Sequence, residues 1–179
     1  MSIGYANITT RKLAEEAGVN HGLVHYYFGS MQELLLQMLE RFTERPIERQ
    51  RAMYAAPGPF IDKWRAAMRF LEDDATSGYA KVWFELQALG WNDPSIRKRV
   101  AQVNLAWWRV VTDAFEKAYE EYGIDSKRYP LEAIVALVST FNQGMHLEVL
   151  SGIRHGHRAL LDLIDAWLVT QEKQRRRKR

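Results

Sequence analysis

The sequence predicts an all-α protein with a small N-terminal helix-turn-helix head and a larger C-terminal helical domain. Apolar residues recur at a spacing of three and four through long stretches, and no stretch shows the alternating pattern of a β-strand. Glycines and five prolines mark the breaks between these stretches. With 179 residues, of which 47% are hydrophobic, the chain is long enough to bury a full core.

Two short helices are expected near the N-terminus. In the first, Leu13, Ala14 and Ala17 share one side, and the small Ala14 allows a second helix to cross closely. Gly18 can adopt the left-handed conformation that ends the first helix, and Asn20 is suited to cap the second. The two helices and their sharp corner predict a helix-turn-helix.

The second helix has an inner and an outer side. Val24 and Phe28 lie one turn apart and are expected to face inward together with Val19. The outer side can enter the major groove of DNA, where each base pair presents a distinct pattern of donors and acceptors. Thr9 and Thr10 are expected to cap the first helix, whose unpaired N–H groups suit a phosphate. The outer side consists of His21, Gly22, His25 and Tyr26.

The remaining helices follow the same apolar spacing. Ser30 and Glu33 form a capping box, so a long helix is expected to start near Met31, and Pro46 is expected to break or kink it. Short connections favour antiparallel packing of neighbours. Further helices are expected over residues 60–75, 78–89, 94–122, 130–151 and 156–172. The chain thus divides into a head with its connecting helix over 1–45, a helical domain over 46–172 and a basic tail over 173–179.

The net charge of +3 comes from the C-terminal end. Six basic residues fall within positions 173–179, so the rest of the chain carries a net charge of −3, and the run is expected to be a solvated tail. The chain has no cysteine, which excludes disulfides and thiolate metal sites. Its longest apolar run, at 133–138, is too short to cross a membrane, and its start lacks the pattern of a secretion signal. We therefore expect a soluble cytoplasmic protein without a membrane partner.

The stretch TTRKLAEEAGVNHGLVHYYFGSMQEL, at residues 9–34, resembles the DNA-binding signature of the TetR family of bacterial repressors. The resemblance includes the Ala-Gly-Val corner, the aromatic run before Gly-Ser, and the Glu-Leu pair that opens the connecting helix. It implies a homodimer that binds a near-palindromic operator in double-stranded DNA. It also implies that residues 46–172 form an effector-binding and dimerisation domain, in which a small-molecule ligand releases the repressor.

The resemblance also assigns residues to DNA. Arg11 would contact a base, whereas Thr10 and Tyr27 would bind phosphates. His25 occupies the place of a phosphate-binding tyrosine, and Met31 that of a common lysine. The expected DNA contacts are Thr10, Arg11, Asn20, His21, Gly22, Leu23, His25, Tyr26 and Tyr27.

The segment before this stretch departs from the family pattern. Family members carry a whole helix before the segment that matches GYANITT, whereas three residues, MSI, precede it here. Either the sequence begins late, or the head lacks its first helix. Residues 1–45 also hold four basic and five acidic side chains, for a net charge of −1. The alternative function is a dimeric small-molecule binding protein whose head is incomplete and does not bind DNA.

The C-terminal segments are rich in aromatic residues, most of which are expected to form ordinary core. Some can line a cavity between helices, which is the usual form of a small-molecule site. Asn142, Gln143 and His146 lie in an otherwise apolar helix and could supply its polar groups, with a satisfied buried network or an interface as the alternative. The candidate ligand-binding residues are Trp83, Phe84, Trp107, Trp108, Phe141, Asn142 and His146.

The last two long segments, 130–151 and 156–172, are apolar over more than one face. Such helices need more than one packing partner, and a second copy of the chain can supply it. In the resembled family the last two long helices of each subunit form a four-helix interface, so a homodimer through these segments is expected.

No enzyme site is predicted. His155 and His157 lie beside a glycine without further metal ligands at suitable spacing. The sequence shows no glycine-rich phosphate loop, nucleophile elbow or convincing pair of carboxylates. We therefore expect no catalytic residue, metal or cofactor.

Overall fold

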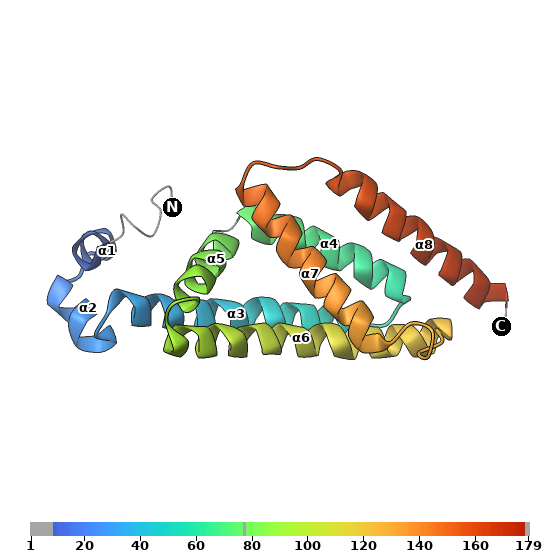
Figure 1. The fold of residues 1–179 in the computed structure, drawn as a ribbon, viewed down its shortest axis with the longest axis horizontal. Helices are drawn as coiled ribbons and strands as arrows, with labels where there is room; N and C mark the ends of the chain where they lie inside the picture. The colour runs from blue at the N-terminus through green and yellow to red at the C-terminus, as the bar shows by residue number, and fades with distance from the viewer. Residues whose placement is uncertain (1–8, 77, 178–179) are drawn as a thin grey trace.

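The computed structural model describes residues 9–76 and 78–177, and these ranges fold into eight α-helices without a strand (Figure 1). This confirms the predicted all-α class. The helices are α1 (Thr10–Ala17), α2 (His21–Phe28), α3 (Met31–Ala55), α4 (Phe60–Thr76), α5 (Tyr79–Gly90), α6 (Pro94–Tyr122), α7 (Leu131–Leu150) and α8 (His157–Arg177). None of the described helices is long and apolar enough to cross a bilayer. The question of an additional first helix falls on residues 1–8, which lie outside the described residues.

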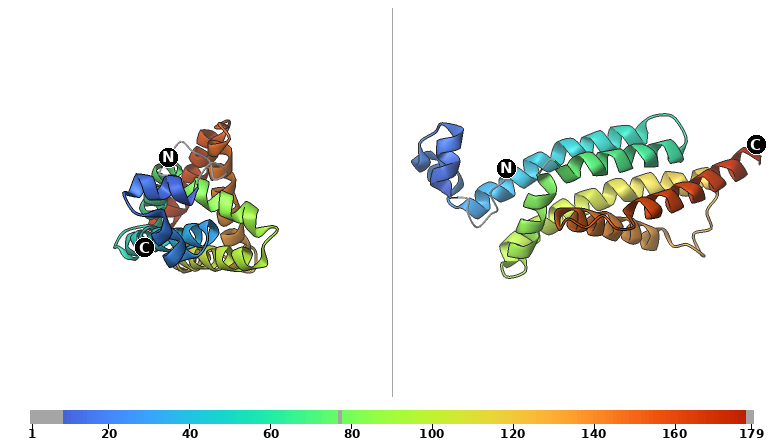
Figure 2. Two further views of the ribbon diagram at one scale, coloured as in Figure 1. Left: turned by 90° about the vertical axis from the view of Figure 1, so that its left-hand side faces the viewer. Right: turned by 90° about the horizontal axis from the view of Figure 1, so that it is seen from above.

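The head consists of α1, α2 and the first turns of α3, and it projects from one end of the molecule (Figure 2). Ala14, Val24 and Leu34 form its buried core, which confirms the predicted close crossing of the first two helices. Ala17 and Val19 differ from the prediction because both are exposed, Val19 by 45%. They lie at the end of α1 and in the corner, beyond the crossing point of the helices.

The long helix α3 joins the head to the rest of the molecule. Pro46 lies inside it, so the predicted break does not occur, and the expected boundary after residue 45 falls within a continuous helix. Leu39, Thr43 and Ile47 are buried around the proline, and the Thr43 hydroxyl donates to the Leu39 carbonyl at 2.6 Å. Packing of these turns offsets the hydrogen bond that the missing N–H of Pro46 removes.

The body comprises α3 to α8 and contains two apolar clusters. The cluster nearer the head joins α3, α5 and α6 and includes Leu39, Leu86 and Val100. The second cluster lies farther along α3 and α6, where α4, α7 and α8 pack, and includes Trp64 and Phe115. Each helix predicted for this part of the chain is present.

The basic end of the chain is more ordered than predicted. Residues 173–177 continue α8, so the expected solvated tail is helical over these positions. Glu172 is buried and accepts hydrogen bonds from Arg175 and Arg176, both at 2.8 Å. Arg175 also lies 3.7 Å from Glu121 of α6. The contact between Arg175 and Glu121 therefore links the basic run to α6.

Gly90 permits a close approach between α5 and α6. A Cβ atom at this position would lie 3.0 Å from Arg97 Cα and 3.1 Å from Arg97 N. Because backbone atoms cannot rotate away, we expect Gly90→Ala to lower the free energy of unfolding by about 1–3 kcal/mol. Urea denaturation measures this change. The control Ala101→Ser, at an exposed position of α6, should change it by less than about 0.5 kcal/mol; equal stabilities would contradict the steric argument.

Candidate functional site

Local capping fixes the corner between α1 and α2. Thr9 Oγ1 accepts a hydrogen bond from the Lys12 N–H at 3.2 Å, whereas Thr10 is the first residue of α1 and not its cap. Gly18 ends α1 in the left-handed conformation, with φ of 66°, and its N–H donates to the Glu15 carbonyl at 3.2 Å. The predicted helix-turn-helix is confirmed.

The second helix of this motif, α2, exposes most of its surface. Val24 is buried and Phe28 is half-buried beside it, so the predicted inner side is correct at these two positions. Tyr26 is 81% exposed and Tyr27 is 69% exposed, and their rings meet edge to face at 5.2 Å. The exposed side comprises His21, Gly22, Leu23, His25, Tyr26 and Tyr27.

The other expected DNA contacts lie on α1 and in the corner. Arg11 is exposed in the first turn of α1, next to the half-buried Thr10. Asn20 caps α2, because its side-chain oxygen accepts the Gly22 N–H at 2.8 Å. The prediction named the whole Asn20 side chain as a DNA contact. Because its oxygen is used by the cap, only the side-chain amide nitrogen is left for that predicted contact.

Gly22 has a local role that the sequence did not reveal. A Cβ atom at this position would lie 3.2 Å from the Asn20 side-chain oxygen. The missing side chain therefore leaves room for the cap of α2. This role adds to the predicted one, in which the bare backbone approaches a partner closely.

Arg99 of α6 neutralises part of the acidic charge near the head. Its guanidinium pairs with Glu40 through hydrogen bonds of 2.8 and 2.7 Å, and it also donates to Glu33. The Gln37 side chain donates to Glu33 at 2.8 Å, and this bond, followed by Arg99, holds the pKa of Glu33 below its ordinary value. The net charge of the N-terminal segment thus overstates the negative field at the head.

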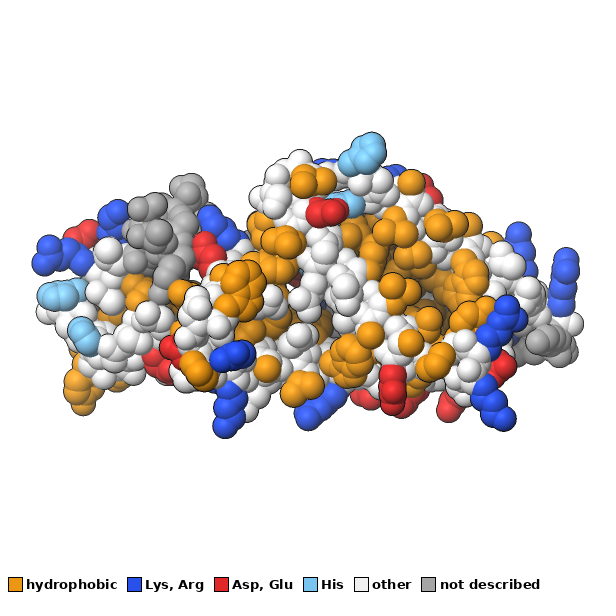
Figure 3. Space-filling model, in the orientation of Figure 1, with side chains coloured by type: hydrophobic (Ala, Val, Ile, Leu, Met, Phe, Trp, Pro, Cys, Tyr) orange, Lys and Arg blue, Asp and Glu red, His pale blue; other side chains and the backbone are white. Residues whose placement is uncertain are grey.

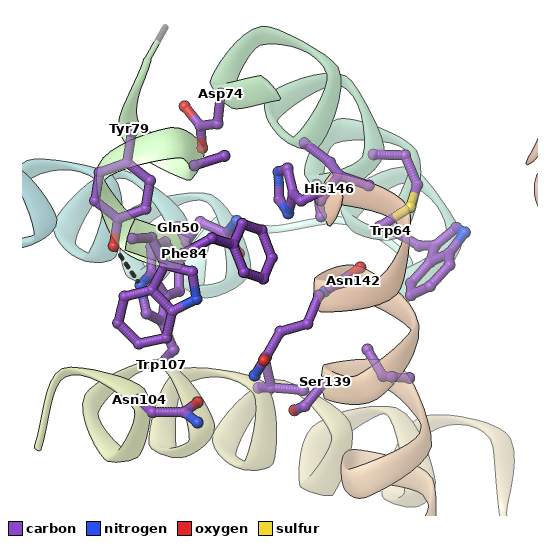
Figure 4. Close-up of a pocket in the computed structure, with 18 of the residues that line it drawn as sticks. Gln50, Trp64, Asp74, Tyr79, Phe84, Asn104, Trp107, Ser139, Asn142 and His146 are labelled. Carbon is purple, nitrogen blue, oxygen red and sulfur yellow. Dashed lines mark hydrogen bonds between the residues drawn. The ribbon is translucent and has the colours of Figure 1, made fainter. Parts of the chain in front are cut away.

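A cavity of about 120 Å³ lies among α3, α4, α5, α6 and α7 (Figure 4). Two predicted aromatic residues do not line it. Trp108 packs against the second apolar cluster, which includes Trp64 and Phe115. Phe141 does not line the cavity, because it precedes Asn142 by one position and its side chain therefore points about 100° away around the helix axis. The predicted residues that do line the cavity are Trp83, Phe84, Trp107, Asn142 and His146.

The cavity wall contains further residues that were not among the candidate ligand-binding residues. Gln50 comes from α3, Trp64 and Asp74 from α4, Tyr79 from α5 and Asn104 from α6 (Figure 4). No local pattern marks these residues, because the packing of five helices brings them together. Gln143, which the sequence had suggested as a polar group, also lines the wall, together with Ser139.

Two polar atoms of α7 lack a partner. Asn142 Oδ1 and His146 Nε2 are buried and make no hydrogen bond with the described residues. The two residues lie one turn apart and therefore share a side of the helix. Burial lowers the pKa of His146, so its imidazole is neutral near pH 7. The alternative of a satisfied buried network does not hold for these two atoms.

The cavity wall is hydrogen-bonded to the connecting helix. The Tyr79 hydroxyl lies 2.8 Å from Thr43 Oγ1 of α3 and accepts from Trp107 Nε1 at 3.3 Å. Burial raises the pKa of Tyr79, so its hydroxyl stays protonated at neutral pH. Since Tyr79 and Trp107 line the cavity, its contents can influence the helix that carries the head.

The helices α7 and α8 leave a broad apolar face uncovered (Figure 3). Leu163 is 68% exposed, Leu137 is 65% exposed and Trp167 is 49% exposed. Along α7 the exposed positions continue with uncharged residues one or two turns apart, which are Ala133, Thr140, Gly144 and Leu147. Apolar faces of this extent mark interaction sites.

Of the two histidines beside Gly156, His157 begins α8 and contacts the end of α7. His157 Nε2 lies 2.5 Å from Glu148 Oε2 at the end of α7, and His155 is exposed. Within the part of the chain that the structure describes, no three histidine or acidic side chains are grouped as a metal site would require.

Comparison with known proteins supports the assignment of the head. Residues 2–38 match the family model described as bacterial regulatory proteins, tetR family. The chain is also similar to the HTH-type transcriptional regulator BetI of Agrobacterium fabrum, with 43% identity over 58 residues. This match spans 31% of the chain and 28% of the relative's length. The N-terminal segment of the chain therefore resembles the DNA-binding domain of the TetR family of bacterial regulatory proteins, and the two matches are confined to part of the chain.

Proposed function

We propose that the protein is a dimeric DNA-binding transcriptional regulator that represses its target genes and is released from its operator by a small molecule. The outward side of α2 carries this proposal. The helix is capped by Asn20 and held against α1 through Ala14 and Val24, while its polar and aromatic side chains face solvent. A short helix held in this way can enter a major groove and contact base edges. The similar protein from Agrobacterium fabrum is itself named a transcriptional regulator.

Dimerisation would place two such heads at a fixed distance. Adjacent half-sites on one side of DNA are separated by about 34 Å, so both heads bind only if the body holds them at that spacing. The uncovered apolar face of α7 and α8 supports a second copy as its occupant. A two-fold interface brings identical faces together, and an apolar face is its own complement.

Release by a ligand requires a difference in ligand affinity between the DNA-bound and the released dimer. Two contacts support a coupling between cavity and head. Tyr79 joins the cavity wall to Thr43 of α3, and Arg99 joins α6 to the first turns of the same helix. A ligand that displaces α5 or α6 would therefore shift α3 and change the distance between the two heads.

Selection of bound sequences from a random DNA pool tests the proposed recognition. We expect a near-palindromic site, and we expect Arg11→Ala to weaken binding to it by about 1–3 kcal/mol, or about 5- to 150-fold, because a base contact is lost. Fluorescence anisotropy at fixed salt measures this affinity. The control Arg51→Ala, at an exposed position of α3 outside the head, should stay within about twofold. Equal losses in the two variants would contradict a base contact by Arg11.

Gly22→Ala should separate folding from recognition. The added methyl group displaces the Asn20 cap slightly, but alanine favours the helix, so the free energy of unfolding should change by less than about 1 kcal/mol. Affinity for the selected site should fall about tenfold, because the methyl group occupies the space between the helix and the base edges. Urea denaturation and anisotropy give the two values. Unchanged DNA affinity would leave Gly22 with its capping role alone.

The alternative function is small-molecule binding without DNA recognition. The net charge of −1 over residues 1–45 favours it, because nonspecific attraction to DNA depends on positive charge. Failure to enrich any sequence at low salt, together with ligand binding in the body, would support this alternative. If a site is enriched instead, transcription of a reporter gene behind that site, measured with and without the protein, would distinguish repression from activation.

A further inference from the structure

The chemistry of the cavity indicates which molecules it accepts. We propose that the cavity binds an uncharged molecule with one aromatic ring as its core and an N–H or O–H group that donates to Asn142 Oδ1. This inference rests on the proposed function, since it names the effector class of the same site. Four features of the wall support it: volume, aromatic surface, charge balance and unpaired polar atoms.

The volume limits the buried core of the ligand. The cavity measures about 120 Å³, and an apolar protein cavity of about 150 Å³ accommodates benzene. One ring is therefore about the largest core that this space encloses. A larger ligand would have to extend out of the cavity or displace a wall residue.

Aromatic side chains form much of the wall. Trp64 of α4, Phe84 of α5 and Trp107 of α6 line the space from three helices (Figure 4), and Trp83 of α5 also belongs to the lining. Flat rings bury large areas and pair favourably with another ring in offset or edge-to-face geometry. This surface favours an aromatic core over a branched aliphatic one.

The charge balance of the wall favours a neutral ligand. Among the described residues that line the cavity, Asp74 is the one with a formal charge at neutral pH, because His146 is neutral there. Arg49 compensates this charge, since its Nη2 donates to both carboxylate oxygens of Asp74 at 3.1 and 3.0 Å. A charged ligand would lose its hydration without gaining an unpaired counter-charge.

Aromatic walls can also attract cations through their π faces. A cation site of this kind gains most from a carboxylate that the ligand can neutralise. In this cavity the Asp74 carboxylate is already paired, and the guanidinium of Arg49 lies 4.0 Å above the ring of Phe70. The positive charge of the site is therefore supplied by the protein, and a second cation would be repelled.

The unpaired atoms of α7 define the polar part of the ligand. Asn142 Oδ1 is an acceptor and needs a donor, whereas neutral His146 can accept or donate through Nε2 according to its tautomer. Because the two residues lie one turn apart, their Cβ atoms are about 5–6 Å apart. A ligand with a donor and a second polar group along one edge can satisfy both atoms.

A series of single-ring probes of similar shape tests each requirement. Benzamide is neutral and donates through its N–H groups, methyl benzoate is neutral without a donor, benzoate is an anion and benzamidinium is a cation. Each is titrated into the full 179-residue chain while the indole N–H signals of the tryptophans are followed by NMR. Trp91 is 74% exposed and does not line the cavity, so its signal serves as an internal reference.

We expect benzamide to bind with a dissociation constant about tenfold or more below those of the three other probes. In Asn142→Leu this preference over methyl benzoate should disappear. The matched control Asn92→Leu makes the same change at an exposed position outside the cavity lining and should keep the preference. Tighter binding of benzamidinium or benzoate, an unchanged preference in Asn142→Leu, or the absence of saturable binding by benzamide would each overturn the proposal.

Operator binding, measured on the same samples, separates this inference from the proposed function. Binding of benzamide with the expected selectivity, but without any recognition of DNA, would reject the regulator and keep the ligand class. Recognition of DNA together with preferential binding of a charged probe would reject the ligand class and keep the regulator.

Discussion

Leu163→Glu should convert the proposed dimer into a monomer. Leu163 is 68% exposed on the uncovered face of α8, and a two-fold interface over this face would bury both copies of the new carboxylate. An unpaired buried charge costs several kcal/mol, so the association constant should fall more than about 100-fold. Light scattering after size exclusion should give a mass near the 20.9 kDa of one chain, in place of about twice that value.

The same variant should lose most of its affinity for the operator. Two heads in one dimer bind with a high effective concentration for the second half-site, which raises overall affinity by about 10²- to 10⁴-fold over a single head. We therefore expect a loss of about 100-fold or more in anisotropy measurements, although the proposed DNA contacts of α1 and α2 are unchanged.

Two controls isolate the position of the charge. Leu105→Glu makes the same substitution at a leucine of α6 that is 54% exposed but lies outside the face of α7 and α8. Leu163→Met changes the same position as Leu163→Glu but keeps its side chain apolar. Both should remain dimeric and bind the operator. A dimeric Leu163→Glu would exclude this part of α8 from the interface, and a monomeric Leu105→Glu would place the interface elsewhere.

The head could be predicted from the sequence because its signals are local. Thr9, Asn20 and Ser30 each cap a helix through a backbone N–H two or three positions ahead, and Gly18 ends α1 within its own turn. Such contacts depend on neighbouring residues and not on the rest of the fold. Burial within the head, which depends on contacts between helices, was predicted less well. Val19 was expected to face inward because it is apolar, but it is exposed.

The cavity could be predicted only in part, for a geometric reason. Asn142 and His146 stand out in an apolar helix, so composition alone draws attention to them. Trp107 and Trp108 are adjacent and chemically identical, yet only Trp107 lines the cavity, because the rotation of α6 decides which of the two faces it. That rotation depends on packing against α3 and α5.

The ion pairs could not be predicted from the number of charged residues in the sequence either. Arg99 lies 59 positions from Glu40 and 66 from Glu33, yet it pairs with both across the contact between α3 and α6. In the same way, Arg175 belongs to the basic C-terminal run but is held by Glu172 and lies near Glu121. The sequence gives the sum of the charges, while the fold determines which of them act on a partner.

Leu39→Ala should produce the largest loss of stability. Leu39 is 1% exposed on α3 and belongs to the cluster that joins the connecting helix to α5 and α6, with Leu86 and Trp83 among its members. Truncation of a fully buried leucine removes apolar burial and leaves a cavity, which together cost about 2–5 kcal/mol. For a chain of this length, each kcal/mol lowers the melting temperature by about 2–4 °C. Calorimetry should therefore register a decrease of about 4–20 °C.

The position of Leu39 gives this variant a second effect. It lies between the head and the cavity wall, because Trp83 belongs both to its cluster and to the lining of the cavity. A gap at this point would loosen the contact between α3 and α5 and weaken the influence of a ligand on operator binding. The control Glu44→Ala, at an exposed position on α3, should change the unfolding free energy by less than about 0.5 kcal/mol and keep the ligand response. A folded Leu39→Ala protein that responds fully to ligand would show that coupling passes through other contacts, such as the hydrogen bond between Tyr79 and Thr43.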